Sequence, residues 1–370
     1  MTVPPSEPDL LRVERHRRRA LVLWDTLSSC IRVRKGVATV GHGPGASGAT
    51  FSWPYGQVLA AALDLDRLDG TRERTVPLLA GLERYRRGNG YADAPGGHER
   101  YYDDNAWLGL DAVQAYAQWG DPSHVANARR TLAFVMEGAH PEGGVWWKER
   151  PKDSRNACST LPAAALALRV RSHTEDASER ERLLDFASLQ VRWADEQLVG
   201  PDELVADNLN NAGMVEPRVW AYNQGSWVGA LMLLADGLQD PLLRVRARAA
   251  ASAGLHHFDG ERLWTEPPAF VGIWYRNLLG LAAREIGSSH EPTPVADGAG
   301  GPDGSLVGAI SITLDRYLDR VWNDARDEST GWCRGSGIGR YDDSPVLDTA
   351  ALVQLYALAA SPATWLSDVS

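Results

Sequence analysis

The strongest constraint on the fold is a regular alternation between two kinds of predicted helix. Helices of one kind are apolar nearly all round and open with glycine, amide or aromatic residues. Helices of the other kind carry more charge and begin after tight turns such as Asp69-Gly70 and Asp240-Pro241. The apolar helices open near residues 53, 104, 156, 223, 270 and 344, a recurrence of roughly 50 to 70 residues. We therefore predict six helical hairpins.

Such hairpins can close into a barrel or extend into a solenoid. An apolar helix needs neighbours on every side, whereas a helix with one polar face can border solvent. The economical arrangement is an all-α (α/α)6 barrel, in which six inner helices are ringed by six outer ones. Only the barrel gathers the six unusual openings around one cleft. We expect residues 10–370 to form this single catalytic domain and the Pro-rich, acidic residues 1–9 to be a disordered tail.

The composition excludes several classes of partner. A net charge of −10 and a pI near 5.4 argue against binding to nucleic acid. The sequence has no run of about 18 apolar residues, so we expect no membrane span. Cys30, Cys158 and Cys333 are too widely spaced for a disulfide framework or a metal site, and we expect no metal and no cofactor. With no apolar leader near the N-terminus, we expect a cytoplasmic protein.

Several segments outside the helices are predicted to be connections. The glycine-rich stretch 41–48 lacks the Lys-Ser/Thr ending of a phosphate-binding loop, and we interpret it as an ordinary loop. Residues 198–221 and 287–304 are also predicted loops, and residues 263–265 a short extended segment. A second acid pair, Asp342-Asp343, lacks flanking tryptophan and amide residues and is interpreted as a helix cap.

One stretch concentrates side chains that suit sugar chemistry, namely Tyr101-Tyr102-Asp103-Asp104-Asn105-Ala106-Trp107. An Asp in the first turn of a helix commonly only caps it. Here two acids stand together among aromatic residues, in a chain with 14 Trp and only 5 Phe. Aromatic rings can pack on a pyranose, while paired carboxyl groups act as nucleophile and proton shuttle. Crowding raises one pKa of such a pair, which leaves one proton donor and one anion.

At these residues the sequence resembles glycoside hydrolase family 76, the α-1,6-mannanases and their relatives. The matching segments within residues 50–285 are 102–107, 143–147, 155–157, 222–225 and, more weakly, 270–273 with Arg276. The resemblance implies an (α/α)6 barrel and a retaining hydrolase of α-mannoside oligosaccharides, α-1,6-linked, with Asp103 as nucleophile and Asp104 as general acid/base. The substrate-binding residues that it implies are Trp53, Tyr102, Asn105, Trp146, Asn156, Tyr222, Asn223, Gln224 and Arg276.

The chain departs from the family pattern near Phe270. Val271 stands where the family commonly has Lys, and residues 267–269 replace an Asp usually found shortly before that Phe. These departures favour short α-mannosides over long mannan. Two alternatives stay open, namely a glycan-binding barrel without catalysis and an (α/α)6 enzyme for another sugar, of the epimerase or uronyl hydrolase type. An epimerase would need paired His bases on the inner helices, and we identify none in the sequence.

Overall fold

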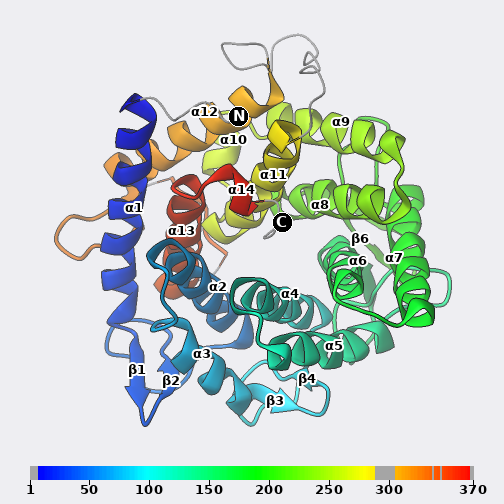
Figure 1. Cartoon of the computed structure of the whole chain (residues 1–370), viewed down its shortest axis with the longest axis horizontal. Helices are drawn as coiled ribbons and strands as arrows, with labels where there is room; N and C mark the ends of the chain where they lie inside the picture. The colour runs from blue at the N-terminus through cyan, green and yellow to red at the C-terminus, as the bar shows by residue number, and fades with distance from the viewer. Residues whose placement is uncertain (1–6, 288–304, 336, 342–343, 367–370) are drawn as a thin grey trace.

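The computed structural model describes residues 7–287, 305–335, 337–341 and 344–366. Within these residues, the inner helices form a closed ring in which each helix contacts the next and the last returns to the first (Figure 1). In ring order they are α2 (Ser52–Asp69), α4 (Tyr102–Trp119), α6 (Ala157–Ser172), α8 (Ala221–Leu238), α11 (Pro268–Gly287) and α13 (Pro345–Ala359).

A second layer of helices surrounds this ring. Most outer helices pack on the inner helix next to them in sequence, while α1 packs on α13 and so joins the two ends of the chain. The outer helices are α1 (Glu7–Ser28), α3 (Thr75–Leu82), α5 (Pro122–Glu137), α7 (Ala177–Gln197), α9 (Pro241–His257) and α12 (Leu306–Arg320). The predicted all-α (α/α)6 barrel of six helical hairpins is confirmed, and closure of the ring excludes the solenoid.

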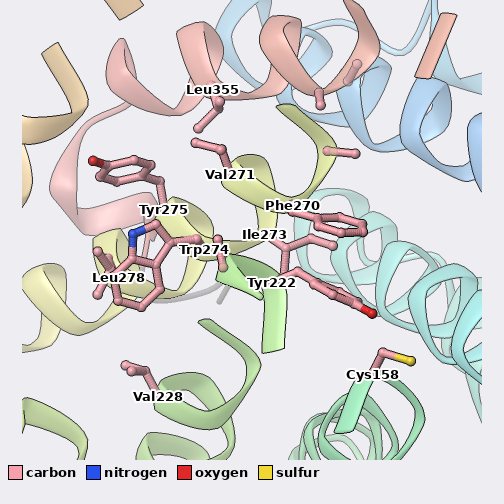
Figure 2. Packing of buried hydrophobic residues seen from close by; sticks show 14 of the residues in the cluster. Cys158, Tyr222, Val228, Phe270, Val271, Ile273, Trp274, Tyr275, Leu278 and Leu355 are labelled. Carbon is pink, nitrogen blue, oxygen red and sulfur yellow. The ribbon is translucent and has the colours of Figure 1, made fainter. Parts of the chain in front are cut away.

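The inner helices are apolar because neighbours cover both their faces. Every residue of α8 from Ala221 to Ala235 is buried, whereas the outer helix α5 buries only one stripe. Small residues bring neighbouring backbones together, since a Cβ added to Gly225 would lie 2.7 Å from the Cα of Trp274 in α11. Figure 2 shows the side chains of this region, including Val228 of α8 and Trp274. Each outer helix returns the chain, so the first turns of all inner helices lie at one end, here called the N-terminal end of the barrel.

The strands lie in the connections that lead into inner helices. Strands β1 (Ile31–Arg34) and β2 (Val37–Val40) form a hairpin before α2, and β3 (Arg86–Arg87) and β4 (Gly90–Tyr91) form another before α4. A three-stranded antiparallel sheet combines β5 (Ser154–Asn156), β6 (Ala206–Asn210) and β7 (Val215–Val219). The remaining described elements are four short helical segments, namely η1 (Glu83–Tyr85), α10 (Glu261–Trp264), η2 (Val321–Ala325) and α14 (Ala363–Leu366).

Two local expectations differ from the structure, and one hairpin of the structure was not expected. Residues 198–221 are not simply a loop, because within them β6 pairs with β5 and β7 pairs with β6. Residues 263–265 are not extended, since Leu263 and Trp264 belong to α10. The β1–β2 hairpin was not predicted, although Lys35 and Gly36 at its tip both adopt positive φ, at 52° and 77°, as a tight hairpin turn requires.

Part of the expected organisation lies outside the described residues. This applies to residues 1–6 of the expected tail, to 288–304 and to Asp342-Asp343. Helix α1 begins at Glu7, slightly before the expected start at Leu10. No helix in the described part of the chain is both long and apolar enough to cross a membrane.

Candidate active site

The acid pair lies in the first turn of α4, at the N-terminal end of the barrel. Tyr101 precedes the helix in extended conformation, and the backbone N–H of Tyr102 donates to the carbonyl oxygen of Trp147. Asp103 is only 4% exposed, while Asp104 is partly buried. The positive end of the helix favours negative charge at this position. The local fold therefore places two adjacent carboxyl groups at the centre of the barrel's N-terminal end.

The two oxygens of Asp103 have different surroundings. Oδ2 accepts hydrogen bonds from the indole Nε1 of Trp147 at 3.1 Å and from the thiol of Cys158 at 3.4 Å. Oδ1 is buried and has no hydrogen-bond partner among the residues that the structure describes. Burial, and then the neighbouring Asp104, raise the pKa of Asp103 well above its usual range, while the donors to Oδ2 oppose this shift. Oδ1 is thus the oxygen left available for chemistry.

Asp104 is held by the start of the preceding inner helix. The hydroxyl of Ser52, the first residue of α2, donates to Oδ2 of Asp104 at 2.6 Å. Burial raises the pKa of Asp104 to about 6, an effect that Ser52 opposes and Asp93 reinforces. Both carboxyl groups therefore bind protons more strongly than exposed aspartates do. Around neutral pH the pair can retain a proton for transfer.

Four aromatic rings form a wall that extends from α2 to α11. The ring of Tyr222 stacks on Phe270 with centroids 4.1 Å apart, and Trp53 stacks on Phe270 at 5.9 Å. Tyr341 adds a ring 5.2 Å from that of Trp53. Figure 2 shows the Tyr222 and Phe270 rings together, with the Tyr222 hydroxyl pointing toward Cys158. The wall is consequently linked to Asp103 through the Cys158 thiol, which donates to that carboxyl group.

Strands β5 and β6 bring polar side chains to the same end of the barrel. Asn156 pairs with Asn208 in the sheet, and its side-chain oxygen accepts from the Ser154 hydroxyl at 2.6 Å. Asp207 accepts from the side-chain amide of Asn223 at 3.1 Å. Burial, and then the charges of Asp103 and Asp207, raise the pKa of Cys158. Burial also raises the pKa of Asp207 itself. Within the described part of the chain, the Oδ1 atom of Asn223 is buried without a hydrogen-bond partner, as expected of a group that binds a ligand.

Several of the residues expected to bind substrate instead support the loops. Both side-chain atoms of Asn105 are used by Tyr91, whose N–H donates to Oδ1 and whose carbonyl accepts from Nδ2. Gln224 likewise accepts from the N–H of Val205 and donates to the carbonyl groups of Glu203 and Ala250. With these bonds made, both amides position backbone around the site and have little capacity left for a sugar.

Tyr102, Trp146 and Arg276 also lie away from the acid pair's free oxygen. The Tyr102 ring stacks on Phe134 of the outer helix α5, and Trp146 packs against the same small cluster. Arg276 donates to Asp64, deep among the inner helices. The structure thus gathers Asp103, Asp104, Trp53, Asn156, Tyr222 and Asn223 at one end of the barrel and leaves the other five predicted residues in supporting positions.

Sequence reasoning missed four residues that contact the pair or its neighbours, namely Ser52, Trp147, Cys158 and Asp207. Trp147 lies in the recognised glycine-tryptophan motif, but Trp146 was selected in its place. Because adjacent side chains of an extended segment point to opposite sides, alternation alone leaves this choice undecided. Ser52 and Cys158 sit in the predicted helix openings, which is the signal that could have found them. Asp207 required the unpredicted strand β6.

The arrangement supports proton transfer and nucleophilic attack at one position. Two desolvated carboxyl groups, one with a free oxygen, stand beside an aromatic wall and an edge of amide and carboxylate groups. Among the residues that the structure describes, no three His, Cys, Asp or Glu side chains are grouped to hold a metal ion. These are the features of an acid-pair site for a sugar.

Comparison with solved structures gives the same fold. An inactive variant of the α-1,6-mannanase GH76A of Salegentibacter sp. HEL1_6, in complex with α-1,6-mannotriose, superimposes with a TM-score of 0.71 at 19% identity, over 93% of this chain and 99% of that one. A GH76 α-mannanase of Bacteroides thetaiotaomicron gives 0.77 at 16% identity, over 93% and 95% of the two chains. Dfg5 of Chaetomium thermophilum, in complex with glucosamine, gives 0.69 at 15% identity, over 100% and 92%.

Sequence comparison assigns the family. The Meiotically up-regulated gene 191 protein of Schizosaccharomyces pombe (strain 972) is 29% identical over 164 residues, which are 39% of this chain and only 37% of that protein's length. The model for Glycosyl hydrolase family 76 matches residues 34–268, which is well over half of the chain. The chain therefore belongs to glycosyl hydrolase family 76.

Proposed function

We propose that the protein is a retaining glycoside hydrolase that cleaves α-mannosides, α-1,6-linked ones in particular, by double displacement. The observation that carries the proposal is the asymmetry of Asp103. One of its oxygens is held by Trp147 and Cys158, and the other is buried and free. A nucleophilic carboxylate needs this combination of a fixed orientation and one unoccupied oxygen.

We assign the two acids the roles that the family resemblance implies. Oδ1 of Asp103 attacks the anomeric carbon while the glycosidic C–O bond breaks, and Asp104 gives its proton to the departing oxygen. A water molecule then attacks the same carbon, Asp104 takes a proton from that water, and the bond to Asp103 breaks. The freed sugar retains its anomeric configuration, and both carboxyl groups return to their starting protonation states. The pKa of about 6 for Asp104 suits a group that must both give and take a proton.

The solved relatives support the choice of sugar. The Salegentibacter α-1,6-mannanase was captured with α-1,6-mannotriose as an inactive variant in which two consecutive aspartates are replaced by asparagine. The present chain also carries two consecutive aspartates, Asp103 and Asp104, in the first turn of an inner helix of the same fold. Trp53 and Tyr341, the more exposed rings of the aromatic wall, offer apolar faces for the rings of such a substrate.

The test is hydrolysis of α-1,6-mannotetraose followed by anomer-resolved proton NMR. The proposal predicts that the α anomer of the product appears first and that Asp103→Asn and Asp104→Asn each abolish its formation. Initial appearance of the β anomer would mean inversion and would remove the nucleophile role of Asp103. Tight binding of the oligomer without turnover by the wild type would instead support the glycan-binding alternative.

A further inference from the structure

A surface hollow of about 290 Å³ lies beside the loop that leads into α2. One wall is the face of the β1–β2 hairpin that carries Arg32, Arg34 and Thr39, and Arg84 forms another. The floor is the glycine-rich loop 41–49, which the catalytic proposal leaves unused. The volume is close to the lower limit for pockets that bind small ligands.

The charge of the hollow is opposite to that of the whole protein. Arg32, Arg34 and Arg84 line it, and no acidic residue does, although the net charge of the chain is −10. Within the described residues, none of these arginines forms an ion pair. Arg84 donates to the Thr39 hydroxyl at 2.6 Å, and Arg32 has a long contact of 3.5 Å with the carbonyl of Ala46. The guanidinium groups thus keep most of their donors for a ligand.

The hairpin and the loop present these groups together. Arg32 and Arg34 are two residues apart in β1, so they share one face of the hairpin. Gly45 and Gly48 adopt positive φ of 73° and 111°, and a Cβ added to either would meet nothing within 4 Å. Glycine adopts such φ values at little cost, so the loop can keep the conformation that forms the floor of the hollow.

The hollow belongs to the same end of the barrel as the acid pair. Gly48 is four residues from Ser52, a separation of at most about 14 Å along the chain, and the Ser52 hydroxyl donates to Asp104. In the same loop, a Cβ at Gly43 would lie 3.6 Å from Pro345, the first residue of α13. A glycan that extends outward from Asp104 over the start of α2 would therefore lead toward the loop that forms the floor of the hollow.

We infer that the hollow binds a phosphate group carried by the glycan substrate, a few sugar residues from the bond that is cleaved. The inference rests on the proposed function for the identity of the sugar. Arginine is the side chain best matched to phosphate, because its planar fork donates two parallel hydrogen bonds to two oxygens. The net negative charge of the chain disfavours binding of anions elsewhere on the surface, whereas the arginines of this hollow can balance the charge of an anionic substituent.

The experiment compares α-1,6-mannotetraose with the same oligomer bearing one phosphate monoester on its terminal sugar. Binding is measured by calorimetry on the Asp103→Asn protein, so that turnover does not interfere. We expect the phosphorylated oligomer to bind with a Kd about tenfold lower, as contacts to charged groups imply. Adding Arg32→Gln and Arg34→Gln should abolish the difference between the two ligands. Arg18→Gln, the same change on the outer helix α1, should preserve it.

Two results would overturn the inference. One is equal affinity of the Asp103→Asn protein for the two oligomers, and the other is a preference that survives the double arginine substitution. Inorganic phosphate is tested as a third ligand. If it binds as tightly as the phosphorylated oligomer, the hollow binds a free anion and not a phosphate carried by a glycan, which also overturns the inference. Failure of the proposed function shows separately, as absence of mannotetraose hydrolysis by the wild type, because these affinities do not depend on turnover.

Discussion

Two acid clusters occupy the same pair of inner helices, α2 and α4, but differ in how their charge is balanced. Deeper along the helices, Asp64 of α2 receives hydrogen bonds from Gln114 of α4 at 2.8 Å and from Arg276 of α11. Arg276 also donates to Gln354 of α13 at 3.0 Å. One cation, one anion and two amides thus tie four inner helices together.

The cluster at the N-terminal end contains no such cation. Among the described residues, Asp103 is bonded only to neutral groups, and Asp104 accepts its side-chain hydrogen bond from the Ser52 hydroxyl. Burial therefore raises the pKa of both. Asp111, which lines a cavity of about 70 Å³ beside Arg276, shows the same effect of burial, partly opposed by that arginine. Asp64, whose charge is balanced by Arg276, helps to hold the barrel together. Asp103 and Asp104, which lack such a counter-charge among the described residues, are available for proton transfer.

The largest expected effect is on catalysis by the uncompensated pair. Asp103→Asn or Asp104→Asn should lower kcat/KM for α-1,6-mannotetraose by at least about 10³-fold, because each removes a group that bonds to the reacting atoms or moves a proton. The free energy of unfolding should stay the same or rise, since an amide costs less to bury than an uncompensated carboxylate. Reducing-end assays and urea denaturation measure the two quantities. Loss of stability with retained activity would reverse the assignment of the two clusters.

The next effect is on stability and comes from the compensated cluster. Arg276→Met should lower the free energy of unfolding by about 3–5 kcal/mol, because it leaves Asp64 buried without its counter-charge. The double variant Asp64→Leu, Arg276→Met should recover most of the loss. Arg182→Met breaks an exposed pair with Glu179 and should cost less than about 1 kcal/mol. A similar loss for Arg182→Met and Arg276→Met in urea denaturation would show that the deep pair is not structural.

The pH dependence of kcat/KM tests whether the pair is desolvated. In the proposed mechanism, catalysis needs a proton on Asp104 and a negative charge on Asp103. Burial raises the pKa of both carboxyl groups, that of Asp104 to about 6, so at acidic pH both are neutral and no nucleophile remains. Activity should therefore fall about tenfold per unit of pH on an acid limb that lies well above pH 4. An acid limb near pH 4, the ordinary range of Asp, would show that burial does not control the pair.

The barrel was predictable because the apolar helices that require it recur regularly along the sequence. Six apolar helices with similar openings need neighbours on all sides, and the ring that joins α13 to α2 provides them. Strands β6 and β7 were not predictable in the same way. The polar sequence Asp207-Asn208-Leu209-Asn210 lacks the alternation of a half-buried strand, and its extended form depends on pairing with Ser154–Asn156, far away in sequence.

The candidate site was predictable to the level of motifs but not of individual side chains. The acid pair, Trp53 and Tyr222 were found because unusual residues stood at helix openings. Asn105 and Gln224 stood at the same openings, yet their amides bond to loop backbone, a use that depends on tertiary contacts. Arg276 was assigned to substrate binding by resemblance, and only the structure shows that its guanidinium group is paired with Asp64.

The smallest expected effect concerns Cys158, whose neutral thiol orients Asp103 without balancing its charge. Cys158→Ala removes one of the two hydrogen bonds to Oδ2 of Asp103, which should raise the pKa of that carboxyl and let it rotate. We expect kcat to fall about tenfold, or ~1.4 kcal/mol, the usual worth of one such bond, with the acid limb of the pH profile moved upward because Asp103 must be ionised to attack. Cys158→Ser keeps a donor and should lose less, while Cys333→Ala, a buried thiol elsewhere, should leave the profile in place. A loss of kcat in Cys158→Ala with an unmoved profile would mean that the thiol only fills space.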